Sequence, residues 1–279
     1  MDFDTLLAAL AEAGGPWEAA DTPVVQLLGQ PGTHLFGLAL DEDARLALLA
    51  RAEDLEAMTG MLAADEVVPF HADWRTDGHV TPVRDQGTCG ACVAFATCAA
   101  LEARARIQQG DREFGLDLSE AHLFHCGNPG GCASGWQPDA ALAWASEHGI
   151  GLERDFPYDA TDQPCQPVAA AMKVADWSAA ASDEQRRRVI AFHGPVIAGM
   201  RVFEDLPHYK TGVYRHVIGE EVGLHAVCVV GYDDAGGYWI VKNSWGTEWG
   251  EGGYLRIAYG EGGLDSEFPF LDPDVVLLP

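Results

Sequence analysis

The sequence predicts an α+β protein, because helical patterns fill its middle and strand patterns fill its last third. From residue 92 to about 109, small apolar residues recur at steps of three and four, which indicates a helix. The runs 225–232 and 238–245 flank the turn sequence Asp-Asp-Ala-Gly-Gly, which indicates an antiparallel hairpin. Helices followed by antiparallel strands are typical of this class.

Further elements are expected on both sides of these. The first stretch, about 3–13, reads as a helix ended by Gly14-Gly15-Pro16, and the stretch 41–61 opens with acidic residues that suit a helix start. The middle of this region, 16–40, carries several Pro and Gly residues and β-prone pieces such as Val24-Val25. Helices are also predicted over 119–125 with Ser119 as N-cap, 136–148 and 183–192, and a strand over 253–259.

Composition limits the possible partners. The 279 residues carry 17 basic and 43 acidic side chains, a formal charge of −26. That charge argues against a nucleic acid or an anionic membrane as partner, although it also fits a merely solvated acidic surface. The acidic start Met-Asp-Phe-Asp does not resemble a secretory signal, so we expect a cytoplasmic protein unless an export signal was removed. We expect a monomer that needs no cofactor and no metal.

Cys92 is the candidate nucleophile among seven cysteines. It follows a Gly-containing approach and begins the predicted helix 92–109. The unpaired N–H groups and the dipole at a helix start favour an anion there, so the pKa of a thiol at this position is lowered. Taken alone, such a cysteine is more often structural, and the case depends on a neighbouring base.

His225 and Asn243 supply that base and its orienter. Folding the hairpin about its turn places residue 243 opposite about 227, and residue 225 opposite about 245. The two side chains therefore lie at the same end of one hairpin. An asparagine can hold one imidazole nitrogen while the other faces a nucleophile, which is the logic of a catalytic triad.

These residues stand in segments that resemble the papain-like cysteine peptidases. Gln-Gly-Thr-Cys-Gly-Ala-Cys at 86–92 is similar to the family's nucleophile segment, with His225 and Asn243 at the expected distances downstream. Leu-His-Ala-Val at 224–227 resembles the histidine segment, and 238–246 with 249–254 resembles the asparagine segment. The resemblance also includes 73–75 and 80–83, and extends over about 68–270.

The resemblance implies a fold and a set of roles. It implies two lobes, a helical one whose central helix begins at Cys92 and an antiparallel β one, with the active-site cleft between them. Cys92 would attack the scissile carbonyl, and His225, oriented by Asn243, would act as acid and base. The Gln86 amide and the Cys92 N–H would form the oxyanion hole. Trp245 would shield the His225–Asn243 hydrogen bond from water.

The other cysteines fit the same template. The resemblance implies disulfides between Cys89 and Cys132 and between Cys126 and Cys165, whereas Cys98 and Cys228 are expected to be buried free thiols. In a reducing cytosol both pairs would be reduced instead. The chain departs from the family at Val93, where Trp is usual, and at Ser134, where Gly is usual.

The pocket for the second residue before the cut is predicted by position in the resemblance. It would be lined by Gly135, Trp136, Gly199, Ala226 and Glu267, with Gln137 nearby. Glu267 at the base of this pocket would favour Arg or Lys, unless it is simply a solvated side chain.

Two domains are expected, a leader over 1–65 and a papain-like peptidase domain over 66–279. The leader would be either an inhibitory pro-segment of a zymogen, lying over the cleft and cut near Asp65 to Val68, or a permanent accessory element. The predicted activity is that of a cysteine endopeptidase acting on peptides or proteins through an acyl-thioester. The alternatives are peptidyl transfer by the same cysteine and a non-catalytic peptide-binding pseudopeptidase.

Overall fold

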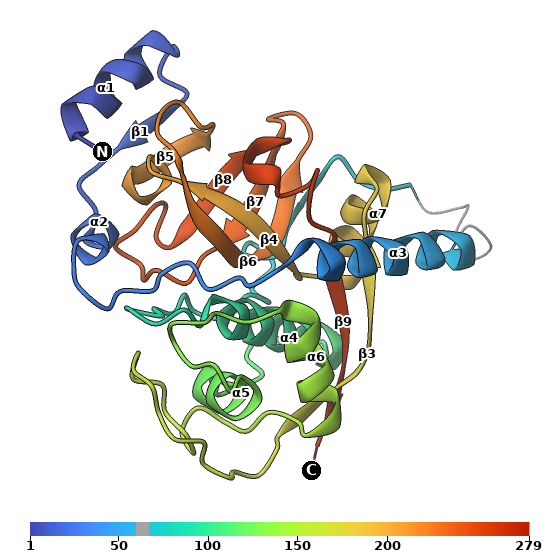
Figure 1. Cartoon of the computed structure of the whole chain (residues 1–279). Helices are drawn as coiled ribbons and strands as arrows, with labels where there is room; N and C mark the ends of the chain where they lie inside the picture. The colour runs from blue at the N-terminus through green and yellow to red at the C-terminus, as the bar shows by residue number, and fades with distance from the viewer. Residues whose placement is uncertain (60–66, 279) are drawn as a thin grey trace.

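Two lobes form the body of the protein, as the sequence predicts. The computed structural model describes residues 1–59 and 67–278, with only the backbone described over 53–59. One lobe is built on helices α4 (Cys92–Gln109), α5 (Glu120–Gly127) and α6 (Pro138–Glu147), and the other on a twisted sheet. Figure 1 shows the helical lobe below the sheet lobe, with β3 and β9 running down beside the helices. The fold is therefore α+β.

Helix α4 occupies the predicted range and forms the centre of the helical lobe. Its residues 92–105 are buried, because small side chains allow both the sheet lobe and the neighbouring helices to approach closely. Gly110 ends the helix in the left-handed conformation, at φ 60°. Ser119 caps α5 as predicted, because its side chain accepts a hydrogen bond from the His122 N–H.

The sheet has the strand order β1-β5-β8-β7-β6-β4-β9-β3, and β2 also pairs with β6. Its neighbours are antiparallel except for β5 and β8, which pair in parallel. The strands are β1 (Trp17–Ala19), β2 (His71–Asp73), β3 (Met172–Ala180), β4 (Val196–Phe203), β5 (Tyr209–Tyr214), β6 (Glu221–Asp233), β7 (Tyr238–Lys242), β8 (Tyr254–Ala258) and β9 (Phe270–Leu277). The predicted hairpin is β6–β7, and the strand expected over 253–259 is β8. One hydrophobic core lies between α4 and the sheet, and a second inside the sheet lobe.

Two local expectations need correction. The pair Val24-Val25 lies in helix α2 (Pro23–Leu28) and not in a strand, because Pro23 stands at its first turn, where its fixed φ and missing N–H suit a helix start. The helix expected over 183–192 is α-helical only in α7 (Asp183–Arg188) and continues as a π-helical turn, η1 (Val189–His193). Gly194, at φ 131°, ends that turn.

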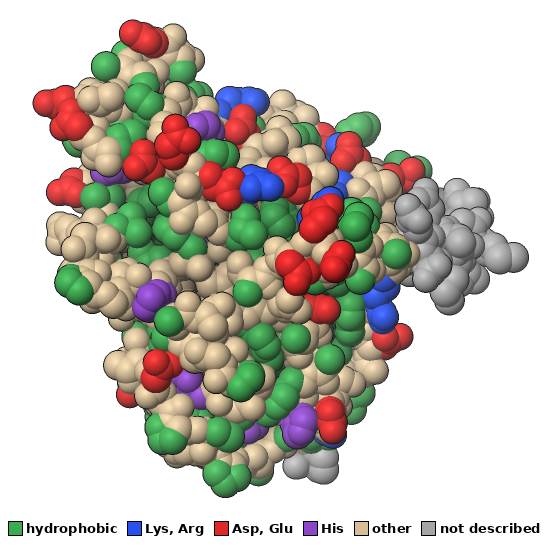
Figure 2. Space-filling model, in the orientation of Figure 1, with side chains coloured by type: hydrophobic (Ala, Val, Ile, Leu, Met, Phe, Trp, Pro, Cys, Tyr) green, Lys and Arg blue, Asp and Glu red, His purple; other side chains and the backbone are tan. Residues whose placement is uncertain are grey.

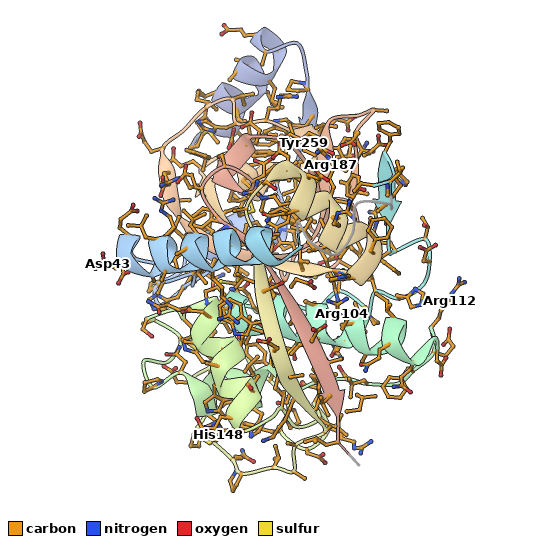
Figure 3. All side chains as sticks on the ribbon, turned by 90° about the vertical axis from the view of Figure 1, so that its right-hand side faces the viewer. Asp43, Arg104, Arg112, His148, Arg187 and Tyr259 are labelled. Carbon is orange, nitrogen blue, oxygen red and sulfur yellow. A yellow bond between two sulfur atoms is a disulfide. The ribbon has the colours of Figure 1, made fainter. Side chains whose placement is uncertain are left out.

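The leader runs over both lobes. Helix α1 (Phe3–Glu12), β1 and α2 lie along the sheet lobe, where β1 extends the sheet at β5. The chain then passes between the lobes and continues into α3 (Glu42–Thr59), which packs on β3. Figure 3 shows α3 crossing the ends of β3 and β9. Of the predicted cleavage region, residues 65 and 66 lie outside the described residues.

No helix within residues 1–59 and 67–278 is both long enough and apolar enough to cross a membrane. Acidic side chains predominate on the upper half of the face in Figure 2, in keeping with the net charge.

Candidate active site

Cys92 is the first residue of α4 and is fully buried between the lobes. The N–H groups of the first helical turn have no acceptor within the helix, so they surround the thiol with partial positive charge. The backbone N–H of Ala226, from β6 of the other lobe, donates to Sγ at 3.4 Å. The sulfur of Cys92 is thus placed where both lobes contribute hydrogen-bond donors to it.

The β6–β7 hairpin brings His225 and Asn243 together. Cys228 pairs with Lys242 and Val229 with Val241, so Asn243 follows opposite residue 227, as the turn predicts. The Nε2–H of His225 donates to Oδ1 of Asn243 at 2.8 Å, and Oδ1 also accepts from the Ser244 N–H at 2.8 Å. Because an amide oxygen only accepts, Nε2 carries the hydrogen. Nδ1, which has no partner among the described residues, is left to act as a base.

The side chain of Gln86 is fixed by Ser244. Ser244 Oγ donates to Oε1 of Gln86 at 2.6 Å, and the carbonyl oxygens opposite the other end of the amide, which only accept, settle that this end carries the donors. Nε2 donates to the Cys89 carbonyl at 2.9 Å and to the Leu35 carbonyl at 3.1 Å. The donor expected in the oxyanion hole is therefore present, and a leader carbonyl occupies it.

Trp245 packs against the His225 ring. Its ring lies 4.8 Å from the His225 ring, centroid to centroid, and is only 3% exposed. Trp249 packs edge-on against it at 4.8 Å, and Phe36 of the leader lies at 6.2 Å. Trp245 therefore lies beside the ring whose hydrogen bond the sequence predicts it to shield.

The leader segment 34–39 fills the cleft and bonds to both lobes. The His34 N–H donates to the Thr88 carbonyl at 2.8 Å, and the Leu38 N–H donates to the Leu224 carbonyl at 3.2 Å. Trp136 N–H donates to Gly37 O at 2.8 Å, and Ala39 N–H donates to Trp136 O at 2.9 Å, so the two segments form a parallel bridge. This segment holds the two lobes together across the site.

Gly37 brings the leader backbone up to Cys92. The Gly37 backbone N–H lies close enough to the sulfur to lower the pKa of the thiol, so the leader presents an amide hydrogen to Cys92 there. A Cβ at Gly37 would lie 1.9 Å from the Gly90 carbonyl oxygen. Only a residue without a side chain fits this position.

Burial between the lobes disfavours the charged forms of Cys92 and His225. It raises the pKa of Cys92 to about 11, although backbone N–H groups act in the opposite direction. It lowers the pKa of His225 to about 4, against a smaller opposing effect of the hydrogen bond to Asn243. In the closed form both groups are therefore neutral at pH 7. The thiolate that the helix start favours requires the cleft to open.

Most of the predicted pocket residues lie against the leader or beside Cys92, whereas Glu267 does not. Gly135 and Gly199 meet the leader closely: a Cβ at Gly135 would lie 2.4 Å from the Gly37 oxygen, and one at Gly199 would lie 2.8 Å from the Leu38 side chain. Trp136 binds the leader backbone, Gln137 caps α6, and Ala226 pairs with Gly199 and contacts Cys92.

Glu267 is placed differently from the prediction. The pocket around Leu38 and Leu40 is lined by Leu48, Pro138, Ile197, Ala198, Gly199, Phe268, Pro269 and Leu271, all apolar. Glu267 lines an adjacent cavity and is paired with Arg201 at 2.6 Å. Its carboxylate is therefore not the floor of this pocket, because the neighbouring Phe268 takes that place.

The cysteines pair as the resemblance implies. Cys89 is bonded to Cys132 and Cys126 to Cys165, whereas Cys98 and Cys228 are free and buried. The first bond holds the nucleophile segment to the loop that carries Gly135. Among the described residues, no group of three or more His, Cys, Asp or Glu side chains could hold a metal ion.

Sequence reasoning missed two contributors to the site. Ser244 orients Gln86, yet it stands beside Asn243 without any signal of that role. The leader residues Leu35, Gly37 and Leu38 occupy the cleft in an extended form that has no periodicity to detect. A glycine followed by apolar residues was the only available sign.

Comparison with known proteins agrees with this geometry. Residues 68–268 match the family described as papain family cysteine protease. The chain is 34% identical to the cathepsin L-like proteinase of Fasciola hepatica over 212 residues, covering 72% of this chain and 64% of that one. It is 37% identical to cathepsin K of Gallus gallus over 251 residues, covering 81% of this chain and 73% of that one.

A solved structure resembles the whole chain, leader included. Digestive procathepsin L2 proteinase from the larval midgut of Tenebrio molitor matches with a TM-score of 0.79 and 27% identity, covering 96% of this chain and 88% of that one. A match over 96% of the chain must include most of the leader. Among sequence relatives the coverage is smaller: the match spans 64% of the Fasciola hepatica proteinase and 56% of ananain from Ananas comosus.

Proposed function

The chain belongs to the papain family of cysteine proteases, and from this premise we propose that it is a cysteine endopeptidase with Cys92 as nucleophile and residues 1–65 as an inhibitory pro-segment. The observation that carries the proposal is that the side chains it requires are buried together between the lobes and are held by their neighbours. Nε2 of His225 is held by Asn243, and the Gln86 amide is held by Ser244. A module that only binds peptides needs none of these contacts.

In the open enzyme, the Cys92 thiolate attacks the carbonyl carbon of the scissile bond. The oxyanion that forms is stabilised by the Gln86 amide and the Cys92 backbone N–H. The imidazolium of His225 then protonates the leaving amine, and an acyl-thioester remains on the sulfur. His225 next removes a proton from water, and the water attacks the thioester. This step releases the carboxylic acid product and restores the Cys92–His225 pair.

Peptidyl transfer uses the same steps until deacylation, where an amine attacks in place of water. No described feature of the site favours an amine over water, so hydrolysis is the better-supported reaction. The substrates are peptides or proteins, and the apolar pocket around Leu38 favours an apolar residue two positions before the cut. The charge of −26 disfavours a nucleic-acid partner, and we expect the enzyme to act as a monomer.

The pro-segment role rests on three contacts. A leader carbonyl occupies the Gln86 donor, a leader N–H faces the Cys92 sulfur, and Leu38 fills the apolar pocket. Because the atom presented to the sulfur is a hydrogen and not a carbonyl carbon, the leader blocks the site without offering a bond to cut there. A permanent accessory element would have no need to enter the cleft in this way.

Two cysteine variants test the activity. Cys92→Ala should abolish hydrolysis of a fluorogenic peptide after activation, because the variant lacks the thiol that forms the acyl-thioester. Cys98→Ala is the matched control, since Cys98 is also buried on α4, and it should retain activity. Equal losses in both variants, or activity in Cys92→Ala, would contradict the proposal. Product analysis with an added amine separates hydrolysis from transfer.

Two glycine variants test the pro-segment. Gly37→Ala should unseat the cleft segment, because its Cβ would collide with the Gly90 backbone. The full-length variant should then react with iodoacetamide at Cys92 at least about tenfold faster than the wild type at pH 7. Gly29→Ala is the control, because Gly29 has φ −82° and nothing within 4 Å of a Cβ. Unchanged reactivity in Gly37→Ala would remove the support for an inhibitory leader.

Self-processing has a separate test. The active chain should shorten on incubation, and the Cys92→Ala chain should not, as measured by mass spectrometry. Shortening of both chains would point to a contaminating protease, and shortening of neither would count against self-cleavage.

A further inference from the structure

A charged cavity adjoins the apolar pocket. It measures about 400 Å³ and is lined on the enzyme side by Arg201, Leu224, Glu267 and Phe268. Leu40 of the leader and Phe268 border both spaces, so the pocket and the cavity are neighbours. The cavity is where the sequence led us to expect an acidic group that selects basic side chains. Its charges decide whether it does so.

Arg201 forms a bidentate ion pair with the carboxylate of Glu267. Its Nε lies 3.0 and 2.9 Å from the two carboxylate oxygens, and its Nη2 lies 2.6 Å from Oε2. The third nitrogen, Nη1, bonds to Glu221 at 2.6 Å. The bidentate geometry favours this pair, and because the two side chains are 36% and 37% exposed, solvent screens part of the attraction. A second cation at Glu267 would have to compete with this pair.

The leader contains such a cation, and the carboxylate does not bind it. Arg45 reaches this cavity, but its guanidinium donates to the backbone carbonyl of Glu267 at 3.3 Å. Its carboxylate partner is Glu42 from its own helix, at 2.7 and 2.9 Å. Acidic and basic side chains gather over the start of α3 in Figure 2. A basic group at this site therefore finds the Glu267 carboxylate already engaged.

From these contacts, and resting on the proposed function, we propose that Arg201 is a specificity-determining residue. By holding the carboxylate of Glu267, it makes the enzyme prefer an apolar over a basic side chain at the substrate position that Leu38 fills. Arg201 lies on β4, two residues after Gly199, so both face the same side of the sheet. One strand, β4, thus carries both Gly199, which shapes the apolar pocket, and Arg201, which neutralises the acidic residue beside that pocket.

The reason is a balance of two costs. An arginine in the pocket would desolvate its charge against apolar walls, and it would gain a partner only by displacing Arg201. Without Arg201, the same carboxylate stands unpaired beside the pocket and becomes an attractive partner. Removing one positive side chain should therefore admit basic substrates, whereas removing Glu267 should not.

The test compares two substrates that differ only in Leu or Arg at the second residue before the cut. Full-length chains are activated by limited treatment with a glutamyl endopeptidase, because residues 52–74 hold no Lys or Arg but include Glu66. That protease is then inhibited, and active sites are titrated. The measured quantity is the ratio of kcat/KM for Leu over Arg. We expect Arg201→Met to lower this ratio by about tenfold or more, Glu267→Gln to leave it near the wild-type value, and the double variant to return to it.

Arg256→Met is the matched control, because Arg256 of β8 forms a similar bidentate pair with Glu251, which lies in the turn that precedes β8. Its ratio should not change. If the wild type cleaves the Leu substrate and Arg201→Met keeps the wild-type ratio, the role of Arg201 is overturned and the proposed function stands. If Glu267→Gln alone lowers the ratio, the pairing argument is wrong. If no chain cleaves either substrate, the proposed function fails and this inference with it.

Discussion

At the scale of single residues, the site depends on side chains that hold other side chains. Asn243 fixes the tautomer of His225, and Ser244 fixes the amide of Gln86. These two neighbours follow β7 directly, so one short segment holds both the His225 ring and the Gln86 amide. Loss of either orienter leaves the reacting groups present but free to turn.

Ser244→Ala tests this positioning role. The variant should lower kcat by roughly tenfold or more, because the Gln86 amide can then rotate its donors away from the oxyanion. KM should change little, since Ser244 does not contact the pocket. Ser178→Ala on β3 serves as the control and should match the wild type. A variant with normal kcat would show that Gln86 is held adequately by its other contacts.

At the scale of elements, π-helical turn η1 is tied to β9 by a charged cluster. The His193 ring lies 2.6 Å from Oδ2 of Asp272, and Arg104 of α4 bonds to the other oxygen of that carboxylate. Arg104 is labelled in Figure 3 beside these elements. The hydrogen bond to Asp272 raises the pKa of His193, although burial and Arg104 act against it.

His193→Gln should therefore be more destabilising in acid than in alkali. A raised folded pKa means that the imidazolium stabilises the fold below the unfolded pKa, near 6.5, and that this contribution is lost as pH rises through the folded value. We expect a difference of less than about 1 kcal/mol between pH 5.5 and pH 8.5, because the ring is half-exposed. Urea unfolding of both chains at the two pH values measures it, and an equal loss at both would contradict the ion pair.

Helix α3 attaches the leader beyond the cleft. Arg51 lies over the Trp177 ring at 3.9 Å and donates to the Trp177 carbonyl at 2.6 Å. Arg51→Ala should loosen this attachment and speed Cys92 alkylation in the full-length chain by a few-fold, since an exposed cation–π contact contributes about 0.5–1 kcal/mol. Arg154→Ala, which removes an exposed arginine elsewhere, should not. Equal rates in all three chains would mean that the cleft segment alone holds the leader.

Elements with a clear period could be predicted, and those without one could not. Helix α4 and the β6–β7 hairpin follow from spacing and turn residues, and with them the meeting of His225 and Asn243. Strands β3 and β9 were not predicted, because their pairing depends on segments about a hundred residues apart. The pairing of Glu267 with Arg201 depends on the same tertiary arrangement, so a prediction from position alone assigned the carboxylate to the wrong space.

At the scale of the whole molecule, opening of the closed form should depend little on pH between 7 and 4.5. Burial holds the pKa of His225 near 4 in the closed form, against about 6.5 for a free imidazole. On opening, however, His225 takes its proton from Cys92, so the closed and open forms bind the same number of protons and the stability of the closed form stays constant in this range. Cys92 alkylation, corrected for intrinsic thiol reactivity with Gly37→Ala, should therefore keep a constant rate between pH 7 and pH 4.5. A corrected rate that rises in acid would show that His225 takes its proton from solvent when the cleft opens.

The crossing of the leader between the lobes also changes what a cut after α3 would mean. While the peptide bond is intact, the cleft segment is a tethered ligand whose effective concentration can reach the millimolar range. Cleavage beyond α3 breaks no contact in the cleft, but it turns an intramolecular equilibrium into a bimolecular one. The cut protein should therefore remain inactive when concentrated and become active on dilution. Protein concentration, and not proteolysis alone, would then determine when this enzyme is active.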